Sequence, residues 1–164
     1  MFNIGDKVVY PMHGAGVIEE IEEKNILGEN RKYYIMKIPI GEMKVMVPME
    51  NIDEIGIRNV VTPVEIEDVI MLLKNPPSDM PDNWNRRYRE NMDRLKSGDI
   101  YEVATVVRNL MLADKEKGLS TGERKMLANA KQILISELVL SKNIKEETAV
   151  DLVNDAVFNN NSTG

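Results

Sequence analysis

The chain has 164 residues, of which 43% are hydrophobic and 29% are charged, and this globular composition suits one domain or two small ones. Its net charge of −6 gives no overall attraction for nucleic acid, so any DNA contact must come from a local basic surface. The chain has no cysteine, which excludes disulfides, thiolate nucleophiles and Cys-ligated zinc. It has neither a signal-peptide pattern nor an apolar run long enough to span a membrane, so we expect a cytoplasmic protein without a membrane partner.

Residues 5–56 have the pattern of short β-strands. Five runs rich in Val, Ile and Tyr are separated by Gly, Pro and Asn turn signals, namely DKVVYP, AGVIEEIEE, KYYIMKIPI, MKVMVPM and NIDEIGI. Few architectures close so small a sheet. We therefore predict a small Tudor-like or SH3-like β-barrel over residues 1–58.

From Thr62 on, the spacing of the apolar residues becomes that of a helix. With Thr62 as N-cap, Pro63 at the first helical position and Glu65 at the third, a helix is predicted that Asn-Pro-Pro at 75–77 ends. The N-cap of the next helix stays open among Ser78, Asp79 and Met80, and the later N-caps are Asp99, Ser120 and Asn143. The four further helices are predicted over residues 81–96, 99–118, 120–141 and 143–158.

These elements give an α+β fold class with two parts. The β module at 1–58 is followed by a compact all-helical domain of about five helices at 62–159. The polar residues 160–164 are predicted to form a disordered tail.

The sequence offers no catalytic or metal-binding constellation. His13 is the only histidine and lies in PMHGAG, where no orienting partner for a general base is evident, so we interpret it as a turn residue. The glycines of HGAG are interpreted as turn residues, and EEIEE at 19–23 as an exposed strand face that protects an edge. We predict no enzyme activity, no catalytic residue, no metal site and no cofactor.

The helix at 81–96 carries the only tryptophan of the chain. Trp84, Tyr88, Met92 and Leu95 lie on one apolar stripe, and this periodicity alone favours Trp84 as a core anchor. From Trp84 to Lys96, however, five basic and two acidic residues give a net charge of +3, against −9 for the rest of the chain. Basic residues beside an aromatic side chain suit a contact with a nucleic-acid backbone and its bases, so both interpretations stay open.

A second basic cluster begins the helix at 120–141, in STGERKMLANAKQ. Arg124, Lys125 and Lys131 follow a predicted helix N-terminus, which already favours phosphate through its free N–H groups. Ordinary surface lysine and arginine remain the alternative interpretation.

These segments together resemble the CarD/CdnL family of bacterial transcription regulators over nearly the whole chain. GDKVVYPMHGAGVIEEIE is similar to the opening module of that family, which also occurs in transcription-repair coupling factors. NWNRRYRENMDRLKSGD and GLSTGERKMLANAKQIL are similar to its helical domain.

The resemblance implies a specific mechanism. The Tudor-like module would dock on the β1 lobe of the RNA polymerase β subunit, partly through an exposed strand. The helical domain would reach the upstream edge of the −10 element, where Trp84 would wedge into the minor groove and stabilise the open complex, at ribosomal RNA promoters among others. The residues that match the basic positions gripping the DNA backbone are Arg86, Arg87, Arg89, Arg124 and Lys125.

The resemblance also indicates the polymerase contact. Lys24 matches one of two basic positions that often touch polymerase, whereas Met46 stands at the other, so that charge is absent. Lys44 lies on the same strand face and is the expected substitute. We expect a monomer associated with the nucleoid through polymerase, with a domain-swapped dimer as the alternative.

Three rival functions are considered. The first is an RNA- or ribosome-binding module with an SH3-like domain, which the seven basic and ten acidic residues of 1–58 disfavour. The second is an enzyme of unknown type, and the third is a sequence-specific repressor reading the major groove. The absence of cysteine and the lone turn histidine argue against the second. The tryptophan and the lack of Asn/Gln-rich base readers on the helix at 81–96 argue against the third.

Overall fold

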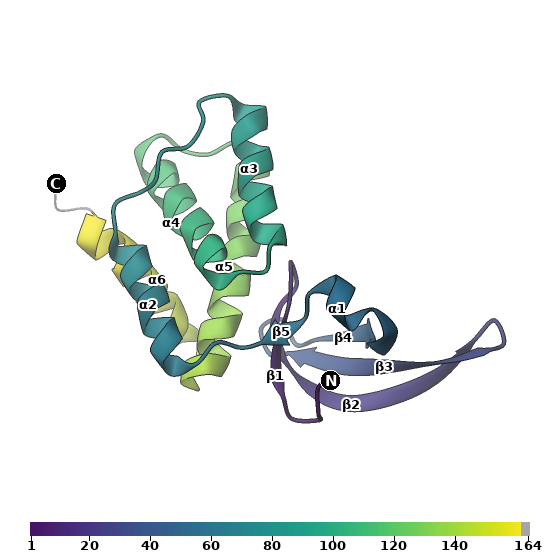
Figure 1. The fold of residues 1–164 in the computed structure, drawn as a ribbon. Coiled ribbons are helices and arrows are strands. Elements are labelled where there is room, and N and C mark those ends of the chain that lie inside the picture. The colour runs from purple at the N-terminus through teal and green to yellow at the C-terminus, as the bar shows by residue number, and fades with distance from the viewer. Residues whose placement is uncertain (162–164) are drawn as a thin grey trace.

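A computed structural model describes the backbone of residues 1–161 and the side chains of residues 1–159. Its N-terminal part is one antiparallel sheet in the strand order β4-β3-β2-β1-β5 (Figure 1). The arrangement of a small sheet followed by a helical domain confirms the predicted α+β fold class. The strands are β1 (Lys7–Tyr10), β2 (Gly14–Ile26), β3 (Glu29–Ile38), β4 (Met43–Pro48) and β5 (Arg58–Asn59).

The long β2–β3 hairpin projects away from the helices (Figure 1). Its two-residue turn consists of Leu27 and Gly28, with positive φ angles of 53° and 83°, as the twist of a tight hairpin requires. Glycine accepts this conformation readily, whereas Leu27 holds it while 99% exposed. A register shift between Ile18 and Glu20 marks a bulge, and β1 pairs with β2 only as far as Val17. The acidic segment 19–23 therefore has β3 on one side and no strand of residues 1–161 on the other.

The prediction of a strand at NIDEIGI is wrong. The chain there forms a short 3₁₀ turn (Met49–Asn51) and the helical turn α1 (Ile52–Ile55), and the fifth strand is Arg58–Asn59 instead. Ile52 and Ile55 stand three residues apart, so a helical turn directs both onto the sheet core. Gly56 ends the turn in the left-handed conformation.

Five helices form the second part of the molecule. Thr62, Asp99 and Ser120 cap their helices as predicted. The N-cap of α3 is Asn83, whose side chain accepts a hydrogen bond from the Arg86 backbone N–H, and none of Ser78, Asp79 and Met80. The helices are α2 (Pro63–Lys74), α3 (Trp84–Lys96), α4 (Ile100–Glu116), α5 (Thr121–Lys142) and α6 (Glu146–Asn161).

The predicted N-cap at Asn143 is also wrong. Asn143 ends α5 as a left-handed C-cap with φ 54°, because asparagine tolerates this conformation better than most residues. α6 runs on to Asn161, and the remainder of the predicted tail lies outside the described residues. Within residues 1–161, no helix has both the length and the apolar composition that crossing a bilayer demands.

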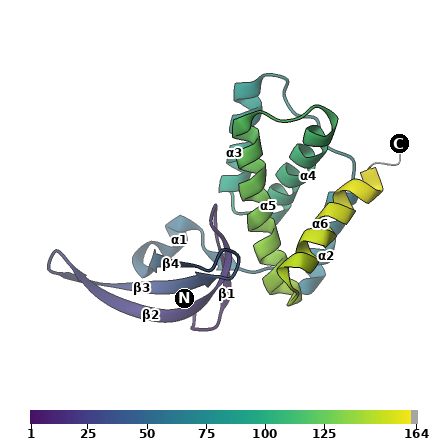
Figure 2. The ribbon, with the colours of Figure 1, turned by 180° about the vertical axis from the view of Figure 1, so that it is seen from behind.

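The two parts meet along α5. The N-terminal end of α5 lies beside α3, and its C-terminal half reaches the sheet (Figure 2). The Ala15 backbone N–H donates to Ser136 Oγ (2.8 Å), and Lys7 Nζ donates to the Leu140 carbonyl (2.9 Å). Each part also has its own apolar core. The division into folding units at 1–58 and 62–159 stays a prediction.

Candidate nucleic-acid interface

Trp84 is the first residue of α3 and is both packed and accessible. Its ring stacks on Tyr88 with centroids 5.1 Å apart, yet 41% of the residue is exposed. The apolar stripe becomes more buried toward the C-terminal end of the helix, since Tyr88 and Met92 are half-buried and Leu95 is fully buried. The stripe therefore anchors α3 at its C-terminal end and presents the indole at its N-terminal end.

A hydrogen bond fixes the orientation of the indole. The Trp84 Nε1–H donates to Ser120 Oγ at 2.9 Å, and the same oxygen accepts the Glu123 backbone N–H at 3.2 Å as the N-cap of α5. The Ser120 hydroxyl donates to Glu123 Oε1 at 3.1 Å. One residue thus caps α5 and holds the aromatic side chain of α3.

Glu123 and Arg87 join the same two helices. Arg87 Nε donates to Glu123 Oε2 at 2.8 Å, and a second Arg87 nitrogen donates to the carbonyls of Pro81 and Asp82. The hydrogen bond from Arg87 lowers the pKa of Glu123 against the opposing effect of burial, and the bond to Glu123 raises the pKa of Arg87. Glu123 is 3% exposed, so this ion pair belongs to the interior between α3 and α5.

The other predicted basic residues are accessible. Arg86 pairs with Glu90 on the surface of α3 (Nε to Oε1, 3.1 Å), which partly offsets its charge. Arg89, Arg124 and Lys125 are exposed, and none forms an ion pair within the part of the chain whose side chains are described. Lys131 instead donates to Asn154 of α6, so it lies apart from this group.

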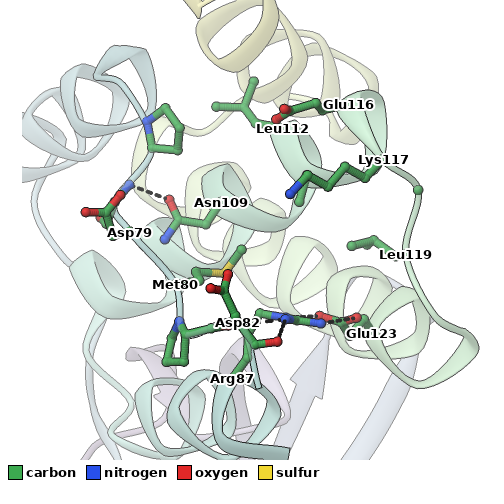
Figure 3. A pocket seen from close by; sticks show the side chains of 15 residues that line it. Asp79, Met80, Asp82, Arg87, Asn109, Leu112, Glu116, Lys117, Leu119 and Glu123 are labelled. Carbon is green, nitrogen blue, oxygen red and sulfur yellow. Dashed lines mark hydrogen bonds and ion pairs between the residues drawn. The ribbon is translucent and has the colours of Figure 1, made fainter. Parts of the chain in front are cut away.

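A pocket of about 330 Å³ lies beside the Arg87–Glu123 pair (Figure 3). Its wall is formed by the segment before α3, the end of α4 and the start of α5. Apart from the paired Arg87 and Glu123, the lining has the three acids Asp79, Asp82 and Glu116 against Lys117, so the pocket would repel phosphate. No group of three or more potential metal ligands is found among the side chains of residues 1–159.

On the β module, Lys44 and Met46 lie on the exposed face of β4, an edge strand of the sheet. Lys44 Nζ is 3.5 Å from Glu19 Oε2, and Met46 is 39% exposed. Lys24 lies further out on the hairpin, opposite Arg31. His13 packs edge-on against Tyr10 in the β1–β2 turn, at 4.3 Å between ring centroids.

Sequence reasoning missed the tertiary roles of Ser120 and Glu123. The sequence predicts Ser120 only as the cap of its own helix, which it forms by accepting the Glu123 backbone N–H. Their bonds to Trp84 and Arg87 join residues 36 apart in the chain, which no local pattern reveals. The basic residues Arg87 and Arg89 are likewise indistinguishable in the sequence, although only Arg87 is neutralised.

Comparison with known proteins covers nearly the whole chain. Residues 2–61 match the CarD-like/TRCF RID domain, and residues 68–154 match the CarD C-terminal domain. YdeB of Bacillus subtilis (strain 168), provisionally named a transcription factor, is 46% identical over 147 residues, which are 90% of this chain and 96% of YdeB. The solution structure of the 72-residue N-terminal domain of Myxococcus xanthus CarD is 30% identical, with a TM-score of 0.32, and covers 36% of this chain and 79% of that domain.

Replacing Ser120 with alanine removes the cap of α5 and the acceptor of the Trp84 indole together. We expect the free energy of unfolding to fall by about 1 kcal/mol, the usual cost of a lost cap. We also expect a red shift of the fluorescence of Trp84, the only tryptophan, because its ring gains contact with water. Thr62→Ala is the matched control, since it removes the cap of α2 and should leave the emission unchanged. An unaltered emission spectrum in Ser120→Ala would contradict the orienting role.

The Arg87–Glu123 pair should also make stability depend on pH. Because the pKa of Glu123 lies below its ordinary value of 4.5, the folded carboxylate stabilises the protein above that pH. This contribution is lost as the pH falls through the lowered pKa, since the unfolded chain then binds the proton first. Denaturant unfolding from about pH 7 to about pH 3 should show a steeper loss in wild type than in Glu123→Gln. Parallel pH profiles would exclude the pair as the cause.

Proposed function

Because the chain belongs to the CarD family, a family of transcription factors, we propose that it stabilises the open complex of RNA polymerase at promoters. In this proposal residues 1–58 bind the β1 lobe of the polymerase β subunit, and residues 62–159 contact the DNA. The contact is the minor groove at the upstream edge of the −10 element, where the duplex begins to melt. Ribosomal RNA promoters, whose open complexes are unstable, are the first candidates.

The accessible, oriented indole of Trp84 is the observation that carries the proposal. A ring that is held by Ser120 and Tyr88 loses little freedom when it enters a base step, so less of the contact energy is spent on ordering. Wedges of this kind partly unstack a base step and kink the duplex. Where the duplex is already partly melted, unstacking a base step costs less free energy. The upstream edge of an opening promoter meets this condition.

Three of the five basic residues are suited to grip the backbone beside the indole. Arg89, Arg124 and Lys125 are exposed, and we propose them as phosphate contacts. Arg86 contributes less because Glu90 competes for it. We propose a positioning role for Arg87, whose guanidinium is engaged by Glu123 inside the protein.

The acidity of the chain fits a two-site mechanism. A net charge of −6 weakens binding to arbitrary DNA, so the helical domain needs a second attachment to reach promoters. Docking on polymerase would raise the effective concentration of Trp84 at the promoter into the millimolar range or above. The local basic surface then has to supply only a modest part of the affinity.

The edge strand β4 is the proposed docking surface. Its unpaired backbone groups can accept a further strand, as in other strand-addition complexes. Met46 supplies exposed apolar area, and Lys44 and Lys24 supply charge on the same side of the molecule's β module. The acidic balance of residues 1–58 disfavours RNA or ribosomes as the partner of this surface.

The decisive experiment measures open-complex lifetime with purified polymerase on a ribosomal RNA promoter. Wild type should lengthen the lifetime, and Trp84→Ala should shorten it again by about tenfold, because loss of a stacked or wedged aromatic costs roughly 1–3 kcal/mol. Binding of the variant to the isolated β subunit should be unchanged. An unaltered lifetime would exclude the wedge.

Salt dependence separates the basic residues by role. Arg89→Gln, Arg124→Gln and Lys125→Gln should each reduce the slope of log affinity against log salt by about one unit, since each removes one phosphate contact. Arg87→Gln should leave the slope unchanged and lower the thermal stability instead. The slopes are measured by fluorescence anisotropy on a bubble-containing promoter duplex. Identical slopes for Arg87→Gln and Arg89→Gln, both reduced, would contradict the assignment of Arg87.

Charge changes on the β module test the polymerase contact. Lys24→Glu and Lys44→Glu should each weaken binding to the β subunit about threefold, as expected for exposed interface charges. Met46→Arg restores the basic residue common in the family and should strengthen it. Lys117→Glu, in the helical domain, is the control. Affinities indifferent to all three β-module changes would remove β4 from the interface.

A further inference from the structure

Helix α5 carries two buried glutamates near its opposite ends. Glu123 is 3% exposed and Glu137 is 2% exposed. Their positions differ by fourteen residues, which is about 21 Å along a helix. Each is paired with an arginine from another element, Glu123 with Arg87 of α3 and Glu137 with Arg58 of β5.

Arg58 joins three segments at the lower end of α5. Its two terminal nitrogens donate to the two carboxylate oxygens of Glu137, at 2.7 Å and 2.8 Å. Its Nε–H donates to the carbonyl of Gly98 at 2.8 Å, in the turn that follows α3. The Val61 backbone N–H completes the shell of Glu137 at 3.0 Å. Arg58 therefore ties the sheet to α5 and to the end of α3 at once.

Around this pair the packing is tight on the Glu137 side, whereas Arg58 also lines an open pocket of about 300 Å³. A Cβ added to Gly14 would come within 2.9 Å of Ser136 Oγ, and one added to Gly98 would come within 3.0 Å of the Pro11 ring. The cavity left between the sheet and the helices measures about 10 Å³, the lower limit for one water molecule. Close backbone approach and tight packing on the Glu137 side together stiffen the contact.

We propose that α5 is a rigid strut between the β module and Trp84, and that Arg58 is the positioning residue that locks its lower end. The upper end is fixed by Ser120 and Glu123, which hold Trp84 and Arg87. α3 is thereby held at both ends, at its start by α5 and just beyond its end by Arg58. The position of Trp84 relative to the β module is set by the length of α5 and not by a flexible linker.

Loss of Arg58 should release this contact before either core unfolds. The carboxylate of Glu137 would be left without its cation, and opening the contact to water restores its solvation. The sheet also meets α5 through the Ala15–Ser136 and Lys7–Leu140 hydrogen bonds and the apolar cluster of Val9, Ala15 and Leu140. Once these contacts open as well, the short connection at 60–62 can act as a hinge. The released state keeps both cores and loses their fixed orientation.

The test is a distance measurement on the free, full-length protein. The chain has no cysteine, so spin labels can be placed at single cysteines introduced for the exposed residues Glu54 and Lys117, one in each part. Wild type should give one narrow distance distribution, and Arg58→Ala should broaden it at least twofold. Arg31→Ala, which removes an arginine from an exposed ion pair on the hairpin, is the matched control and should leave the width unchanged. A broad distribution in wild type, or a narrow and unshifted one in Arg58→Ala, overturns the proposal.

Glu137→Gln removes the charge of the other partner of the ion pair, so the test does not depend on the correct folding of one variant alone. It should broaden the distribution as Arg58→Ala does, while the tryptophan emission and circular dichroism stay those of wild type. If Glu137→Gln leaves the distribution narrow, the pair is not the lock.

The consequence for promoters rests on the proposed function and is measured separately. Arg58→Ala should bind the β subunit as wild type does, yet shorten the open-complex lifetime about tenfold, because a hinged domain has a lower effective concentration at the DNA. If Arg58→Ala broadens the distance distribution while wild type has no effect on the open-complex lifetime, the proposed function fails and the positioning role of Arg58 is retained. If wild type extends the lifetime and Arg58→Ala does so equally, rigidity plays no part in it.

Discussion

A carboxylate can be buried only where a cation and hydrogen-bond donors replace its water, and α5 meets this condition twice. Glu123 and Glu137 tie α5 to α3 and to the sheet, respectively. Neither partner could move away without leaving an unpaired charge in the interior. Together with the Ala15–Ser136 and Lys7–Leu140 hydrogen bonds and the small apolar cluster of Val9, Ala15 and Leu140, these two pairs fix where α3 lies and how the sheet meets the helices.

The placement of charge follows the same logic. Arg87 and Arg58 form ion pairs inside the protein, whereas Arg89, Arg124 and Lys125 remain exposed on α3 and α5, the two helices that hold the half-exposed indole. The exposed basic residues proposed for DNA contact thus lie on α3 and in the first turn of α5. The edge strand β4 lies on the other part of the molecule, in the sheet that extends sideways from the lower half of α5 (Figure 1). Two separate contact surfaces on one stiff body suit a protein that bridges two partners.

Local signals in the sequence predicted much of this fold. The side chains of Thr62, Asp99 and Ser120 accept from backbone N–H groups two or three residues away. Such caps can therefore be predicted from the local sequence. Periodicity failed at NIDEIGI, where a run of seven residues fits one helical turn as well as a strand. It also could not separate Arg87 from Arg89, because their difference lies in a glutamate on another helix. The exposure of Trp84 depends on how far its stripe overhangs the bundle, which is a tertiary property.

The bulge near Glu19 has a consequence for self-association. Beyond it β2 has a free backbone edge, and the side chains that follow include Glu20, Glu22 and Glu23. A second copy offering its own β2 would bring like charges together, so sheet-to-sheet polymerisation through this edge is opposed. β4 has no such run of acids and carries exposed Met43 and Met46. The module therefore leaves the β4 edge open to a further strand, whereas the acidic part of the β2 edge opposes pairing with a second copy of itself.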